Sequence, residues 1–361
     1  MNIKIKTVFF LTTAIIFFMQ SFVYARTTVT SHLLGTGKLT LQGIDDTIDE
    51  ADKFFNRYGS GLVNAHLLAN QRGYAVGVPD LAYKDVMFGL SVNSGMANMG
   101  YFDKTKEHDL GELPGVALNP TFNFGFGITD RTCFIGKFFL YSSDIYRPPV
   151  DHDILTLETF KICSVGGKFR YQAVKKRNVL PGIFNFGGIS LGTGADFMYG
   201  KINFSGEYIH DYDANIDISI GNYNLGKDVT VPVHLDTIYH GKYNWLMVSG
   251  SVDALIQGEF FWIFNLYTGF SFSLNTGRLS LDVNADGVVT TTYADYLALF
   301  PNPVDHVLAK TEQKHSPAYI KSYYILGMDV NFYLFNISFE SMVDLHNKQD
   351  VSAQIAFRFQ I

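Results

Sequence analysis

The chain of 361 residues has little charge and little cysteine. Charged residues make up 17% of it, whereas a soluble domain carries about a quarter. The formal charge of −6 excludes the basic field that a nucleic-acid partner would need. Two cysteines exclude a disulfide-dense scaffold. Beyond the N-terminus no run of about 18 apolar residues occurs, so we expect no transmembrane helix in the rest of the chain.

Motifs for catalysis or metal binding are also missing. The histidines are scattered, and no H-E-x-x-H, G-x-S-x-G or Cys/His constellation occurs. The segments Asp151–Asp153 and His210–Asp213 bring His and Asp together, but a solvated loop is the simpler interpretation of each. We therefore expect no enzyme activity and no cofactor.

The first 25 residues have the pattern of a secretory signal peptide. Lys4 and Lys6 precede an apolar core at Val8–Met19, and Ala25 follows Val23 and Tyr24 at a cleavage point. The core is shorter than the roughly 20 residues that span a bilayer. We expect export and cleavage after Ala25.

Alternation with a period of two is the strongest signal in residues 85–361. In Phe122–Thr129, phenylalanines alternate with asparagine and glycine, and Leu266–Leu274 and Val351–Ile361 alternate similarly. Such alternation predicts strands with an aromatic face and a small, polar face. A soluble sandwich also alternates, but its polar face would carry Lys and Glu. Aromatics outside and small polar groups inside favour an all-β, antiparallel transmembrane β-barrel, which must close on itself.

Ten segments are long enough to cross a membrane, at about nine residues or more. They are Lys84–Ala97, Leu118–Thr129, Arg131–Ser143, Leu157–Val174, Gly182–Gly200, Tyr243–Phe260, Asn265–Asn275, Tyr319–Phe332, Ile337–His346 and Asp350–Ile361. If Asp228–His240 also crosses with a partner, the number rises to twelve. The alternative to about ten strands is therefore a barrel of 12–14. Short turns alternate with long connections, which predicts long loops on the outer side.

Residues 26–84 form a separate N-terminal segment that is expected to carry two short helices. One starts near Asp45 or Asp46 and ends at Gly59, and the other covers Leu62–Gln71. Two positions are open for this segment: a plug inside the barrel, or a cover over its periplasmic mouth.

One short segment, LDVNADGVVTTTY, begins like a calcium loop. Asp282, Asn284 and Asp286 fit the first half of an EF-hand, but Tyr293 stands where the loop needs Glu. We expect N-A-D-G to be the turn of a short hairpin within an outer loop. Weak, millimolar calcium binding is the alternative.

The cysteines lie on consecutive predicted strands. Cys133 has the parity of Lys137 and is expected to face the lumen, while Gly166 and Gly167 hint at a bulge after Cys163. A cross-strand disulfide between Cys133 and Cys163 and two buried thiols are the alternatives.

Three strings carry a resemblance to a known family: GVPDLAYKDVMFGLSVNSGMANMGYF, NFGFGITDRTCFIGKFF and VLPGIFNFGGISLGTGADFMYGKINFSGEY. They resemble spirochaete outer-membrane surface antigens of the leptospiral surface-adhesin type, over roughly residues 77–208. The resemblance implies an outer-membrane barrel, surface exposure and, for some members, binding of host matrix components. The final residue, Ile361, departs from the aromatic residue with which such barrels commonly end.

Two functions follow. The first is an adhesin-like surface barrel that presents long outer loops, above all Lys201–Lys242 and Thr276–Ala318, to an extracellular or host protein. The second is a narrow, porin-like channel or hydrophobic-solute transporter gated by an N-terminal plug. A barrel of about ten strands leaves little open lumen, which favours the first. Small inward residues such as Gly125 and Ser271 favour the second. The expected location is the outer membrane, with lipid around the barrel.

Overall fold

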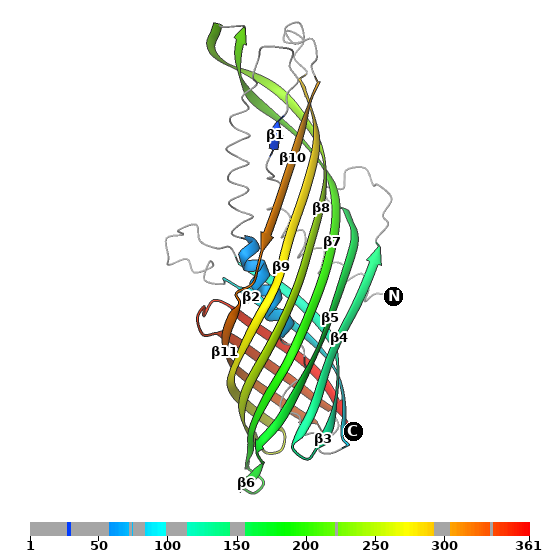
Figure 1. Ribbon diagram of the computed structural model, residues 1–361, viewed down its shortest axis with the longest axis vertical. Helices are drawn as coiled ribbons and strands as arrows, with labels where there is room; N and C mark the ends of the chain where they lie inside the picture. The colour runs from blue at the N-terminus through cyan, green and yellow to red at the C-terminus, as the bar shows by residue number, and fades with distance from the viewer. Residues whose placement is uncertain are drawn as a thin grey trace.

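The computed structural model describes residues 27–29, 58–71, 74, 84–98, 114–144, 156–220, 223–291, 304–332 and 335–361. These residues form one 13-stranded antiparallel sheet and one helix (Figure 1). The strands are β1 (Thr27–Val29), β2 (Val86–Ala97), β3 (Gly115–Thr129), β4 (Thr132–Asp144), β5 (Thr156–Val174), β6 (Arg177–Leu180), β7 (Phe184–Ile220), β8 (Tyr223–Phe260), β9 (Phe264–Thr291), β10 (Val304–His315), β11 (Ile320–Phe332), β12 (Phe335–Asp344) and β13 (Val351–Gln360).

Ten of these strands close into a barrel. The ring runs β2-β3-β4-β5-β7-β8-β9-β11-β12-β13, and β13 pairs back with β2 from Val351–Met96 to Gln360–Met87. Closure pairs every strand on both sides, as a lipid environment requires. The predicted barrel of ten strands is confirmed. The alternative of 12–14 strands is wrong, because residues 228–240 continue β8 rather than crossing separately.

Side chains alternate between lipid and lumen as the sequence predicts. In β9 the exposed fraction of Phe270 is 58%, whereas that of Tyr267 is 2%. In β3 the phenylalanines at 122, 124 and 126 are exposed, and the residues between them are buried. The apolar outer surface therefore belongs to the barrel wall, and the polar residues fill its interior.

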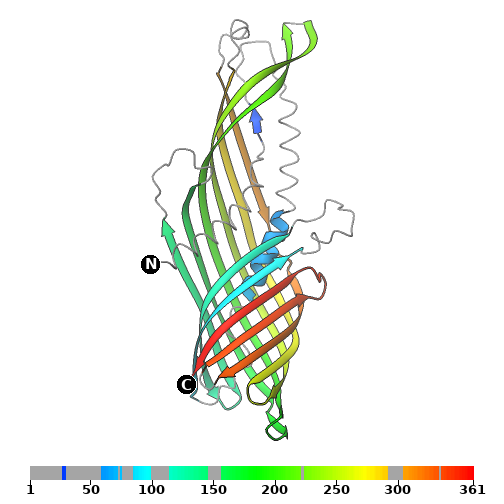
Figure 2. The same cartoon turned by 180° about the vertical axis from the view of Figure 1, so that it is seen from behind.

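Three barrel strands continue far beyond the ring (Figures 1 and 2). β7 leaves its neighbour β5 at Ser205 and runs to Ile220 beside β8. β9 pairs with β11 as far as Leu274 and with β10 from Leu279 onward. Together β7, β8, β9, β10 and the short β1 form what we call the outer sheet, which rises from one end of the barrel.

The predicted hairpin turn at N-A-D-G is wrong. Residues 284–287 lie inside the continuous strand β9, with β8 on one side and β10 on the other. Two flanking strands supply backbone hydrogen bonds throughout, and this pairing overrides the local turn preference of Asn, Asp and Gly.

The helix covers residues 58–71. It includes the predicted second helix, Leu62–Gln71, and the predicted helix end at Gly59 is wrong because the helix continues through that residue. Most of the predicted first helix, with Asp45 and Asp46, lies outside the described residues. Among the described helical residues, none forms a segment long and apolar enough to cross a membrane.

Candidate functional site: a lumen closed by a helix

The helix of residues 58–71, which we call the lumen helix, lies inside the barrel rather than below it. Together with Tyr74 it packs against, bonds to or shares a buried cluster with inward residues of all ten barrel strands. The prediction of a plug is thereby favoured over that of a periplasmic cover.

Small residues let the helix backbone approach the wall closely. Ala65 and Ala69 form one buried cluster with Ala97 of β2 and Ala117 of β3. Between them stands Gly95, where an added Cβ would lie 2.0 Å from the carbonyl oxygen of Ala65. Only a residue without a side chain fits at that position.

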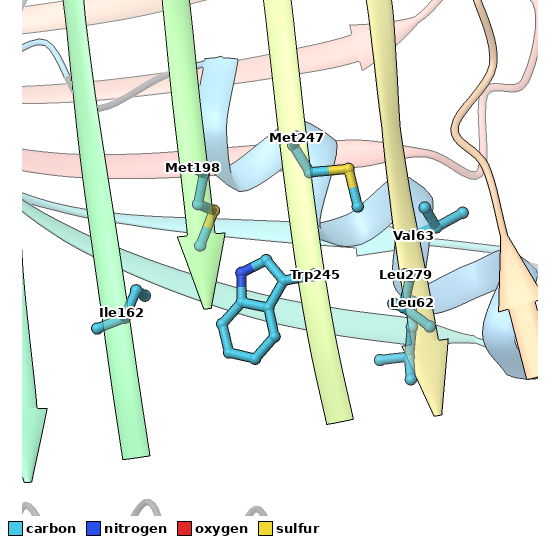
Figure 3. Packing of buried hydrophobic residues seen from close by; sticks show 7 residues of the cluster. All are labelled: Leu62, Val63, Ile162, Met198, Trp245, Met247 and Leu279. Atoms are coloured by element: carbon cyan, nitrogen blue, oxygen red, sulfur yellow. The ribbon is translucent and has the colours of Figure 1, made fainter. Parts of the chain in front are cut away.

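Two apolar clusters anchor the helix on the remaining walls. Leu62 and Val63 pack among buried side chains of β5, β7, β8 and β9, namely Ile162, Met198, Trp245, Met247 and Leu279 (Figure 3). Leu68 packs with Leu255, Tyr267, Tyr323, Ile325 and Met342. Each fully buried leucine contributes roughly 1.5–3 kcal/mol to docking. The apolar contacts therefore stabilise the docked position of the helix.

Hydrogen bonds fix the C-terminal end of the lumen helix. The side-chain amide of Gln71 donates to the hydroxyl of Ser273 at 2.9 Å and to the Oδ1 atom of Asn275 at 2.7 Å. Asn119 donates to the carbonyl oxygen of Ala69 at 3.4 Å. These bonds come from β9 and β3, on different sides of the helix, and satisfy groups that would otherwise be buried without partners.

Tyr74 sits at the centre of a buried group of charges. Its hydroxyl donates to Oδ1 of Asp196 at 2.6 Å, and the same oxygen pairs with Nζ of Lys137 at 2.7 Å. Lys137 lies over the Tyr74 ring at 4.7 Å, and Lys168 lies 5.4 Å from the ring centre. Lys168 in turn pairs with Asp253 at 2.5 Å.

Gly166 makes this group possible. Its strand β5 lies between Lys137 of β4 and Asp196 of β7, and the three residues are in register. A Cβ at Gly166 would lie within 2.8 Å of the Asp196 carboxylate, the Tyr74 hydroxyl and the Lys137 side chain. The sequence hint of a bulge here is wrong, since the register continues unchanged through Gly166 and Gly167; the glycine makes space for an ion pair instead.

Other lumen charges are paired as well. Arg170 bonds Asp253 at 3.3 Å, and Arg358 bonds Asp329 at 3.2 Å. Beside the connection between β12 and β13, Nζ of Lys321 lies 2.7 Å from the Asp344 carboxylate and 2.6 Å from the Asp350 carboxylate. Burying a charge is costly unless it is paired, and these pairs meet that condition. Lys168 and Arg170 share one carboxylate, whereas Lys321 faces two, so these two groups carry an excess charge of opposite sign.

His66 is the one described histidine on the lumen helix. Its Nε2 atom lies 2.8 Å from the Tyr243 hydroxyl, and its ring stacks on Trp245 with 4.6 Å between centroids.

The calcium candidates lie in a row. Asp282, Asn284 and Asp286 occupy alternate positions of β9, so they share a face and are spaced by about 7 Å along the strand. Calcium ligands must converge to 2.3–2.6 Å from one ion. No group of three His, Cys, Asp or Glu among the described residues is placed to hold a metal ion. Calcium binding here stays a prediction, and the spacing of these three residues along the strand does not support it.

The candidate disulfide is not formed. Both cysteines are free. Cys133 faces the lumen, as predicted, in a buried cluster with Tyr74, and it pairs with Arg170 across β4 and β5. Cys163 pairs with Leu140, seven positions farther along β4, or about 23 Å away. A disulfide needs Cα atoms within about 7 Å.

Of the two His/Asp segments, Asp151–Asp153 lies outside the described residues, and His210–Asp213 belongs to the outer part of β7. Sequence reasoning missed Tyr74 and the charge pairs around it. The available signal was a charged residue at a strand position whose side chain faces the lumen. Only Lys137 was recognised from that signal.

A family model matches most of the chain. The Lsa36-like family model matches residues 43–360. A search of curated protein sequences gives no significant match.

Solved structures give distant matches. The toluene transporter TbuX of Ralstonia pickettii is 10% identical, with 83% of this chain and 98% of that chain covered and a TM-score of 0.25. The translocator domain of the autotransporter NalP from Neisseria meningitidis is 12% identical, with 88% and 97% covered and a TM-score of 0.27. A Pseudomonas aeruginosa FadL homologue is 13% identical, with 84% and 97% covered and a TM-score of 0.22. These scores are too low to transfer any property of those proteins to this chain.

Proposed function

This chain belongs to the Lsa36-like family, and we propose that its outer-membrane barrel serves as a closed anchor whose outer sheet binds an external protein. The binding role is adhesin-like. The family resemblance suggests host matrix components as the class of partner.

The closed lumen is the observation that carries the proposal. The lumen helix and Tyr74 contact inward residues of all ten strands, and the described lumen charges around them have partners of opposite sign. A helix held across the lumen in this way obstructs the passage of a solute. The chain instead extends β7 and β8 to 37 and 38 residues, whereas about 9–11 residues are enough to cross a membrane.

A mixed surface on the outer sheet suits a protein partner. Ile209 lies 25 residues beyond Phe184, the first residue of β7 (209 − 184), and so stands well above the membrane. Its exposed fraction is 47%, and that of Ile238 on the adjacent strand is 53%. Glu207 pairs with Ile238 in register and is also exposed. Exposed apolar side chains that lipid does not cover, beside charged ones, are typical of a protein interface.

The test compares binding of the intact protein and two variants to an immobilised preparation of host extracellular-matrix proteins. Ile209→Ser with Ile238→Ser should weaken binding at least several-fold, and replacing residues 209–236 by an Asn-Gly turn should abolish it. Glu312→Gln with Lys314→Gln, also exposed on the outer sheet, is the matched control and should bind normally. Equal binding by all variants, with folding confirmed by heat-modifiable gel migration, would refute the proposal.

A second candidate function is a narrow channel or hydrophobic-solute transporter gated by the lumen helix. This function is favoured because the lumen is obstructed by a docked helix rather than by the barrel strands themselves. The side-chain amide of Asn70 is buried without a hydrogen-bond partner, a cost that release of the helix would relieve. Solute-dependent ion conductance by the intact protein would support this function over the first.

A further inference from the structure

The two ends of the barrel differ, and this difference gives the chain its direction. One end carries short connections, at residues 130–131, 175–183 and 261–263. The other end carries the outer sheet and the longer connections between β2 and β3 and between β4 and β5. Outer-membrane barrels place short turns in the periplasm and long loops outside. The outer sheet therefore marks the external end.

Residues 59–61 of the lumen helix lie at the external end. A Cβ at Gly59 would lie 2.2 Å from the ring of His315, the last residue of β10 in the outer sheet. A Cβ at Gly115, where β3 starts at the same end, would lie 2.2 Å from the backbone of Gly61. This part of the helix thus lies at the outer mouth, against strand ends that belong to that mouth.

The chain then descends to the opposite end. Tyr74 reaches Lys137, the sixth residue of β4 from the turn end. The backbone nitrogen of Lys84 donates to the carbonyl oxygen of Gly127 at 3.2 Å, two residues before β3 ends at the short turn. Between residues 58 and 84 the chain has therefore crossed the lumen from the outer mouth to the periplasmic rim.

The segment Thr27–Val29 lies beyond the outer mouth. β1 pairs antiparallel with β10, in the register Thr27–Ala309, Thr28–Leu308 and Val29–Val307. The same part of β10 pairs with residues 285–287 of β9, more than ten positions past Leu274, where β9 leaves the barrel. Figure 1 shows β1 beside β10, well above the barrel.

From these positions we propose that the chain is threaded through its own barrel, so that the segment around Thr27–Val29 is displayed outside the cell as an edge of the outer sheet. The lumen helix is then part of the segment that crosses the membrane inside the barrel, and the same helix closes the lumen. The outer sheet thereby gains β1 as an edge strand on the external side. This proposal holds whether or not the outer sheet binds a partner.

Antibody labelling of intact cells tests the proposal. A short epitope inserted between Arg26 and Thr27 should be labelled without permeabilisation, as should the same epitope between Lys348 and Gln349 in the outer β12–β13 turn. An epitope between Phe261 and Trp262, at the periplasmic end, should be labelled only after permeabilisation. Labelling of the first epitope only after permeabilisation, in a folded protein, would overturn the threaded topology.

A second measurement does not depend on an insertion. With both native cysteines replaced by serine, Thr28→Cys and Leu308→Cys should form a disulfide within the chain, because directly opposed strand residues are close enough for one. Thr28→Cys with Lys314→Cys is the matched control, since Lys314 lies six positions, or about 20 Å, along β10 from Leu308 and should not cross-link. Peptide mass mapping reads the result. No cross-link in the first pair, or equal cross-linking in both, would overturn the proposal.

Discussion

Gly95→Ala is expected to push the lumen helix away from β2, because the added methyl group has no space. A Cβ at Gly95 lies 2.0 Å from the carbonyl oxygen of Ala65 and 2.7 Å from the amide nitrogen of Ala69, and ordinary contact begins at 3.4 Å. The oxygen must therefore move by 1.4 Å (3.4 − 2.0) and the nitrogen by 0.7 Å (3.4 − 2.7). Both atoms are backbone, so no change of rotamer relieves the contact.

The helix has little room to move into. On its other sides it packs against Trp245, Met247 and Leu255, which are buried. Overpacking of a filled interior costs about 1–3 kcal/mol. A change of that size corresponds to roughly a 5- to 150-fold shift in the equilibrium between docked and undocked helix.

Hydrogen exchange of the helix amides, followed by mass spectrometry, measures this shift directly. Peptides covering residues 60–71 should exchange faster by that factor in Gly95→Ala. Gly250→Ala is the matched control, because Gly250 is also a strand glycine but a Cβ there meets nothing within 4 Å. If both variants exchange at the rate of the unaltered protein, the reasoning about helix packing is refuted.

One further prediction concerns the lumen. Lys137→Met leaves the buried carboxylate of Asp196 without its cation and should cost about 3–5 kcal/mol, whereas adding Asp196→Asn should recover most of the loss. Urea titration followed by heat-modifiable gel migration measures the stability of both variants, and equal midpoints would contradict the prediction.

Much of the barrel is predictable from its sequence because membrane strands obey a local rule. Alternating faces such as those of Phe122, Phe124 and Phe126 follow from a period of two, and the need for closure turns a list of strands into a ring. The parity of Lys137 was enough to place Cys133 in the lumen. These inferences need only neighbours along the chain.

The errors arose where distant strands decide the local structure. The motif at residues 284–287 has turn residues, yet β8 and β10 hold it extended. Gly59 has the preference of a helix end, yet it stays helical where His315 packs against it. Lys168 and Asp253 are 85 positions apart, and their pairing depends on a register across strands that no local pattern encodes.

Single-channel conductance of the refolded mature protein in a planar bilayer, beside a chain lacking residues 26–84, tests most directly whether the lumen helix closes the barrel. We expect the intact protein to be silent and the shortened chain to show discrete, reproducible steps, with folding of both confirmed by heat-modifiable migration. Discrete steps from the intact protein, or silence from a folded barrel without the helix, would contradict a closed anchor.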